Sequence, residues 1–420
     1  MNSLLTNLLK IFRWLLGVVF VFSGFVKLID PLGTAYKFQD YFAVMGLERL
    51  SGSALVFAVA LSVIELLIGL NLLAGIRLKI TMITAAVFMI VMTPLTLWIA
   101  LKNPVSDCGC FGDALVIGNW ATFDKNIILS LLVIAIFILM RYHTVILKPK
   151  AEWVLMGYSL IFAMAFAHVN YHYLPMIDFR PYKIGKNLPK EMAVPPGAQA
   201  NVYSTTFTLE KNGVQKEFSL ENYPDSTWTF VAQHTRLIKK GFTPAIHDFS
   251  IRDANMNDLT DSILNLNKYL FLLVSYDLDQ MSTNHLARIE HIYQFAQQNH
   301  YAFYMLTGSA SDVIAHFQQV NKVGFPICTT DPTTLKTMIR SNPGLILLYH
   351  GTVLNKWSND ALPRLTDPLS SNPNDETPSI PSAWEALGFA VLYIILFWVI
   401  RLWLTTKYKQ SKNSYYQTTN

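Results

Sequence analysis

The sequence predicts an α-helical membrane bundle of six transmembrane helices that carries one extracytoplasmic α/β domain. Composition supports this class, because 52% of the residues are hydrophobic and only 15% are charged, against about 25% charged in a typical soluble domain. The apolar residues gather in six stretches that approach the ~20 residues needed to cross a bilayer. A polar stretch, residues 170–383, separates the fifth from the sixth. These features exclude a disordered chain and an ordinary cytosolic enzyme.

The predicted spans lie near Ile11–Ile29, Ser53–Ile76, Ile80–Leu101, Ile127–Met140, Trp153–Val169 and Trp384–Leu404. The fourth run is short, so we expect that span to begin earlier, near Ala121. The first is no cleavable signal peptide, because it contains Arg13 and Lys27 and lacks a small-residue cleavage site.

Basic residues fall on one side of the membrane if six spans alternate. They are Lys10, Arg13, Arg77, Lys79, Arg141, Lys148, Lys150, Arg401, Lys407, Lys409 and Lys412. The positive-inside rule makes that side cytoplasmic. We therefore expect a multi-pass protein of the bacterial inner membrane, with membrane lipid around it and both termini cytoplasmic. The net charge of +5 reflects this topology, and no nucleic-acid partner is expected.

The predicted organisation has seven parts. They are a four-helix membrane unit (1–145), a fifth transmembrane helix (146–170), a linker and β-hairpin region (171–243), an α/β domain (244–366), a tether (367–383), a sixth transmembrane helix (384–405) and a cytoplasmic tail (406–420) that we expect to be disordered. The hairpin is predicted from two alternating runs that flank the turn Lys211-Asn212-Gly213.

Strands and helices alternate in the α/β region. The predicted elements are a buried strand Tyr269–Ser275, a helix Asn284–Asn299, a strand Ala302–Leu306, a helix Ser309–Val320, a short helix Thr333–Ile339 and a hairpin of Gly344–Tyr349 with Val353–Trp357. A strand–helix–strand–helix unit followed by a hairpin is typical of a compact α/β domain.

This region resembles the thioredoxin-like domains of peroxiredoxins and thiol reductases. Pro244 precedes the pair Asp248-Phe249, and Pro343 stands where that family places its cis-proline. The resemblance implies a cis Asn342–Pro343 bond and a client-binding groove beside Asn342 and Pro343. Residues 276–282, where the family carries Cys-x-x-Cys, contain no cysteine, so thiolate chemistry is excluded there. Cys328 is either a buried structural thiol or, less in keeping with its position, a displaced nucleophile.

The segment SDCGCFGDALVIGNW, between the third and fourth spans, is the sharpest chemical feature of the sequence. Cys108 and Cys110 flank a single glycine, so a disulfide between them closes a small strained ring that exchanges readily. We interpret them as a redox pair facing an oxidising compartment. Three other readings stay open: a structural role, part of a metal site, and lipidation. Zinc normally needs four ligands, and no metal is predicted.

The first four spans and this loop resemble the DoxX/MauE-like membrane family. The resemblance lies in Arg13 with LLGVVFVFSGFVKLIDP, in Glu65 within VIELLIGLNLLAG, and in the DCGCFGD loop. It implies a four-helix unit linked to thiol or sulfur-compound oxidation, a quinone as electron acceptor, and a fused or partner thioredoxin-like protein. Cys108 and Cys110 would then be the catalytic pair.

Three ionisable residues in the membrane are candidates for a quinone site or a proton relay. Glu65 lies about midway along its span, where a lone carboxylate is costly, and Lys27 or Arg13 can pair with it. The alternative for Glu65 is a buried structural pair, and for Arg13 and Lys27 it is snorkelling from the two ends of the first span.

Two weaker features remain. His168 and His172 share one helical face and can bind metal only with a third ligand, so an interfacial role is favoured. Phe38–Leu47 is either an amphipathic segment in the membrane interface or an ordinary ordered loop.

Two functions follow from these observations. The first is a membrane thiol–disulfide redox protein that relays electrons from an extracytoplasmic dithiol client to a membrane quinone through Cys108 and Cys110. The second is a non-catalytic membrane scaffold, or an envelope assembly factor with a binding-only thioredoxin-like domain. A transporter is disfavoured, because the sequence shows no repeat.

Overall fold

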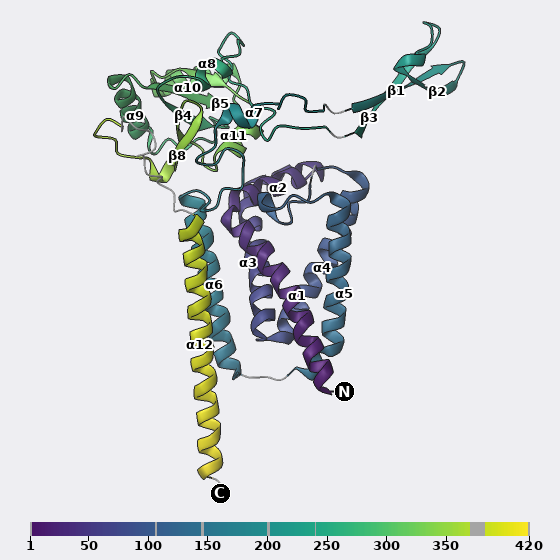
Figure 1. Ribbon diagram of the computed structural model, residues 1–420, viewed down its shortest axis with the longest axis vertical. Coiled ribbons are helices and arrows are strands. Elements are labelled where there is room, and N and C mark those ends of the chain that lie inside the picture. The colour runs from purple at the N-terminus through teal and green to yellow at the C-terminus, as the bar shows by residue number, and fades with distance from the viewer. Residues whose placement is uncertain are drawn as a thin grey trace.

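The computed structural model describes residues 2–105, 107–143, 147–199, 202–239, 241–369 and 383–418. Within these residues, six helices are long and apolar enough to cross a membrane. The N and C termini lie at one end of the helical bundle and the α/β domain lies at the other (Figure 1). The prediction of six spans is confirmed.

The spanning helices are α1 (Asn2–Ile29), α3 (Ala54–Ala74), α4 (Leu78–Lys102), α5 (Asn119–Leu139), α6 (Pro149–His172) and α12 (Ala383–Thr418). Helix α5 begins before its apolar run, as expected. The backbone of α12 stays helical to Thr418, so the prediction of a disordered tail is wrong for that stretch. Most of the predicted tether, residues 370–382, lies outside the described residues.

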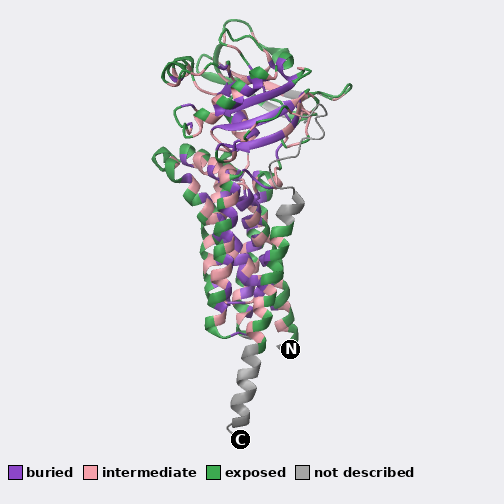
Figure 2. Ribbon diagram, turned by 90° about the vertical axis from the view of Figure 1, so that its left-hand side faces the viewer, coloured by how far each residue is buried: buried purple, intermediate pink, exposed green. Residues whose placement is uncertain are grey.

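Helices α1 and α3 pack closely through glycines. A methyl group added at Gly24 would lie 2.5 Å from the backbone nitrogen of Leu66, and one added at Gly69 would lie 2.5 Å from that of Val21. The backbones therefore touch where no side chain intervenes, which is how small residues allow close helix approach in membranes. Buried residues fill the middle of the bundle and exposed ones face outward (Figure 2).

A short helix, α2 (Pro31–Val44), lies across the end of the bundle nearest the α/β domain (Figure 1). Its N-cap is Asp30, whose carboxylate accepts a hydrogen bond of 2.8 Å from the backbone N–H of Gly33, and Pro31 occupies the first turn. Both choices are favoured at a helix start. The predicted segment Phe38–Leu47 thus belongs to a helix that starts seven residues earlier, at Pro31, and ends at Val44.

The linker region carries a three-stranded antiparallel sheet of order β2-β1-β3, formed by β1 (Val202–Lys211), β2 (Val214–Ser219) and β3 (Thr229–Lys239). The predicted hairpin is β1–β2, whereas β3 was not predicted. This sheet projects away from both the bundle and the α/β domain (Figure 1).

The α/β domain holds a five-stranded sheet of order β6-β5-β4-β7-β8. Strands β4, β5 and β6 run parallel, while β7 and β8 are antiparallel to their neighbours. The bounds are α7 (Leu188–Met192), α8 (Thr260–Leu264), β4 (Tyr269–Ser275), α9 (Leu286–Gln298), β5 (Ala302–Thr307), α10 (Ser311–Asn321), β6 (Ile327–Thr329), α11 (Pro332–Met338), β7 (Gly344–Tyr349) and β8 (Thr352–Ser358).

Every residue of the central strand β4 is buried, because separate apolar cores cover the two faces of the sheet. The Asn342–Pro343 bond, directly before β7, is cis, as predicted.

Candidate functional site

Cys108 and Cys110 lie together at the end of the bundle beneath the α/β domain. Both are free thiols, with their Sγ atoms 2.8 Å apart. Gly109 between them has φ +66°, a left-handed conformation that glycine adopts without strain. The carboxylate of Asp107 accepts a 2.9 Å hydrogen bond from the N–H of Gly109 and so holds the turn closed.

Helix α2 fastens this loop to the bundle. The hydroxyl of Tyr41 donates a 2.6 Å hydrogen bond to the carbonyl of Cys108, and Lys37 forms a 2.8 Å ion pair with Asp107. Cys108 packs in an apolar cluster with Ile99. Each cysteine is only 7% exposed, so a partner thiol reaches either sulfur only if the cover over the loop moves.

The two thiols differ in acidity. The hydrogen bond from the Cys108 thiol lowers the pKa of Cys110 to about 6, and the ammonium groups of Lys125 and Lys27 add to this effect against the cost of burial. The same hydrogen bond and burial raise the pKa of Cys108 well above its ordinary value. Cys110 is therefore the more acidic thiol of the pair, and the thiolate is the reactive form of a cysteine.

A buried ion pair lies directly under the loop. The Nζ of Lys27 on α1 is 2.7 Å and 2.8 Å from the two carboxylate oxygens of Glu65 on α3. The Ser23 hydroxyl lies 2.9 Å from Glu65 Oε2 and 2.8 Å from the carbonyl of Cys110. A hydroxyl has one proton to donate, so Ser23 donates at any moment either to Glu65 or to the carbonyl of Cys110.

Arg13 does not join this cluster. It precedes Lys27 by fourteen residues on α1, a separation of about 21 Å at ~1.5 Å per residue. Its guanidinium donates from Nε and Nη2 to the carbonyl of Leu72, at 3.1 Å and 2.8 Å. The structure thus brings Glu65, Lys27 and the cysteines together and places Arg13 at the other end of the bundle.

A narrow cavity of about 20 Å³ borders Cys110, lined mainly by apolar side chains of α1, α4 and α5 together with Glu65 and Lys125. That volume accommodates about one water molecule. A quinone ring does not fit in that volume.

The α/β domain contacts the same end of the bundle through Arg340, in the segment before the cis-proline. Its Nε is 3.0 Å and 2.9 Å from the carboxylate oxygens of Asp30, and its Nη2 is 2.9 Å from Asp113. Despite burial, Asp30 and Asp113 keep the pKa of Arg340 above its ordinary value. This ion pair joins residues that are 310 positions apart.

Asn342, a predicted groove residue, ties that segment to the loop after β4. Its side chain accepts from the Ser275 hydroxyl at 2.7 Å and donates to the carbonyl of Asp277 at 2.8 Å, and its carbonyl accepts from the Ser282 N–H at 3.1 Å. A cleft of about 740 Å³ separates this loop from α2, with Asp40 and Tyr276 on opposite walls. The predicted groove region therefore faces the bundle. Cys328 is buried in β6.

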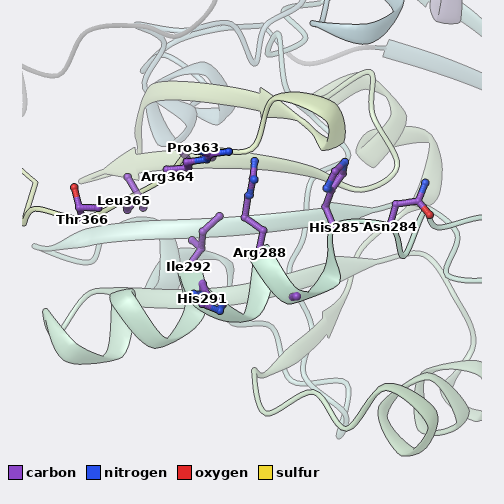
Figure 3. Close-up of a pocket in the computed structure, with 10 residues that line it drawn as sticks. Asn284, His285, Arg288, His291, Ile292, Pro363, Arg364, Leu365 and Thr366 are labelled. Carbon is purple, nitrogen blue, oxygen red and sulfur yellow. The ribbon is translucent and has the colours of Figure 1, made fainter.

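Other candidate features lie away from the cysteines. A surface hollow between α9 and residues 363–366 is lined by Arg288, Arg364, His285 and His291 (Figure 3). The ring of His172 is 4.4 Å from that of His168 and forms a 2.6 Å contact with Asp360. Across the described part of the chain, no group of three or more metal-ligating side chains is found.

Sequence reasoning missed several residues of the site. Ser23, Tyr41 and Lys125 contact the cysteine loop or its surroundings, and Arg340 with Asp113 joins the two parts of the protein. The Asp30-Pro31 pair is a helix-start signal that could have located α2. No local pattern marks Arg340, because its partners come from distant segments.

The fold and site define a multi-pass membrane protein with a paired-thiol loop at one end of its bundle. Residues 5–141 match the family described as methylamine utilisation protein MauE, so this segment is similar to that family. Residues 203–240, which include most of the projecting sheet, match a domain of unknown function, DUF8463. No curated protein matches the chain significantly.

Proposed function

We propose that the protein is a membrane thiol–disulfide redox protein in which Cys108 and Cys110 exchange electrons with a dithiol client outside the cytoplasm. The proposal rests on the contact between the free thiols of Cys108 and Cys110 across the Gly109 turn. The pKa of one thiol is raised and that of the other is lowered. The match of residues 5–141 to a MauE membrane unit supports a membrane accessory role.

The exchange proceeds in two balanced steps. A client thiolate attacks Cys108 of the oxidised pair, the Cys108–Cys110 bond breaks, and Cys110 leaves as a thiolate. Cys110 is the better leaving group because its pKa is the lower of the two. The second client thiolate then attacks the client sulfur of the mixed disulfide, which releases an oxidised client and leaves the pair reduced.

Reoxidation follows the same chemistry in reverse with a disulfide of a second protein. The quinone implied by the sequence resemblance stays a prediction. The Ser23 hydroxyl holds the loop through the carbonyl of Cys110, and the Lys27 charge stabilises the Cys110 thiolate, whereas the Glu65 charge opposes it.

The α/β domain, which we propose to be thioredoxin-like and extracytoplasmic, would position the client. Its sheet order and the cleft of about 740 Å³ over α2 support this role. The domain has no cysteine in residues 276–282, so it can bind a thiol client without reacting with it.

Trapping of mixed disulfides tests the proposal. In Cys110→Ser, Cys108 is a lone thiol that can still attack the disulfide of an oxidised client, which is the exchange in reverse, and one client thiolate leaves. Because Cys110 is then missing and cannot displace the client, we expect client proteins to stay attached to Cys108 and to be released by reductant. The matched control is Cys328→Ser, which removes a thiol in the α/β domain and should trap nothing. Absence of mixed disulfides in Cys110→Ser and in Cys108→Ser contradicts the redox function.

A non-catalytic scaffold is the second candidate, and the 7% exposure of both cysteines favours it. Alkylation of the protein in intact cells separates the two functions. A mixture of dithiol and disulfide forms supports the redox protein, whereas cysteines that stay reduced under oxidising conditions support the scaffold.

A further inference from the structure

A polar cavity lies at the opposite end of the bundle from the cysteines, where the protein termini lie. It measures about 190 Å³ and is bounded by α1, by the turn between α3 and α4, and by α12. Its lining includes three cationic side chains, Lys10, Arg13 and Arg401, and two indoles, Trp14 and Trp398. The cavity therefore combines positive charge with the aromatic residues found at membrane–water interfaces.

The arginines are fixed in place. Arg13 is 7% exposed, and its Nη1 lies 3.5 Å from the Nδ1 of His143. The Nη2 of Arg401 donates to the carbonyl of Ala74 at 2.9 Å, and its guanidinium stacks 4.5 Å from the Trp398 ring. The positions of both charges are thus set before any ligand arrives.

Among the described residues, no Asp or Glu forms an ion pair with Lys10, Arg13 or Arg401. The carbonyls at the end of α3 accept from two of the five N–H groups of Arg13 and from one of Arg401. After these hydrogen bonds to α3, both guanidiniums still have N–H donors, and these lie next to the cavity.

We propose that this cavity binds the phosphate group of an anionic phospholipid. Two guanidiniums and an ammonium around one hollow match the charge and the acceptor oxygens of a phosphodiester. Trp14 is 52% exposed on the outer surface of α1, where lipid surrounds the bundle. Because Arg401 and Trp398 belong to α12, the site is complete only when that last helix joins the MauE-like unit.

Native mass spectrometry of the full chain in detergent tests the site. The probes are phosphatidylglycerol, phosphatidylcholine and inorganic phosphate. We expect the unaltered protein to retain more phosphatidylglycerol than phosphatidylcholine. Arg401→Gln should bind phosphatidylglycerol about fivefold more weakly, which corresponds to the ~1 kcal/mol that each basic residue contributes near a membrane surface. Arg401→Lys should keep most of this binding. Arg141→Gln is the matched control, because Arg141 is an exposed arginine near the same end.

Each outcome bears on the proposal. Retention of inorganic phosphate but not of phosphatidylglycerol overturns the lipid source and leaves a site for a soluble phosphate. Equal retention of the two lipids, or equal loss in Arg401→Gln and Arg141→Gln, overturns the site itself. If Arg401→Gln does not fold, the comparison of phosphatidylglycerol with phosphatidylcholine on the unaltered protein still decides it.

Discussion

Replacing Lys27 by methionine should destabilise the bundle strongly. The side chains of Lys27 and Glu65 are 4% and 3% exposed, and Lys27→Met removes two contacts of 2.7 Å and 2.8 Å. Among the described residues, Glu65 then keeps only the Ser23 hydroxyl as a hydrogen-bond partner. Removal of one member of a buried ion pair costs about 3–5 kcal/mol, whereas replacement of both members by apolar groups is often neutral or stabilising.

The assay is denaturant unfolding of the purified protein in detergent, with Lys27→Met, Glu65→Met and the double variant in one cycle. We expect each single variant to lose about 3–5 kcal/mol and the double variant to regain most of that loss. Lys102→Met, at an exposed position in the last turn of α4, is the control. Single variants within about 1 kcal/mol of the parent, the range of surface pairs, would refute the reasoning.

Three further predictions follow from the packing and the ion pairs. Gly69→Ala should lower the free energy of unfolding by about 1–3 kcal/mol through overpacking. Gly157→Ala, whose added methyl group would meet no atom of another segment within 4 Å, should leave stability unchanged or raise it in the same unfolding assay. Equal effects of the two changes contradict the close α1–α3 contact. Arg340→Gln should increase hydrogen exchange in α2, and unchanged exchange would show that the ion pair does not hold the domain. Despite burial, Lys356 and Arg180 keep the pKa of Asp178 below its usual value. The Asp178 carboxylate therefore stabilises the folded protein above about pH 4, and this stabilisation is lost as the pH falls further. Asp178→Asn should flatten that acid dependence, measured by thermal unfolding between pH 3 and 7.

Local patterns identified the spans and most of the strands. The run Tyr269–Ser275 predicted β4 residue for residue, because a strand buried on both faces reads as an unbroken apolar segment. The spans were found because a bilayer imposes both length and composition. The pairing of Lys27 with Glu65 was one of two options, since two basic residues of α1 were candidates.

Features that depend on tertiary contact escaped the sequence. Strand β3 is rich in polar residues and pairs only with β1, so its alternation is weak. The site at Arg340 joins Asp30 and Asp113, and none of these residues is unusual in its own segment. The single glycine between Cys108 and Cys110 is plain in the sequence. The pKa contrast between the two thiols is not, because it arises first from their mutual hydrogen bond and then from Lys125 and Lys27 on other helices.

The α/β domain is covalently joined to the membrane at both of its ends, by α6 before it and α12 after it. Such a domain stays at one copy per bundle whatever the level of expression, and its effective concentration over the cysteine loop is fixed by the chain itself. A soluble partner would have to find this loop by diffusion and would compete with others for it. The α/β domain, by contrast, stays beside the loop because it is part of the same chain.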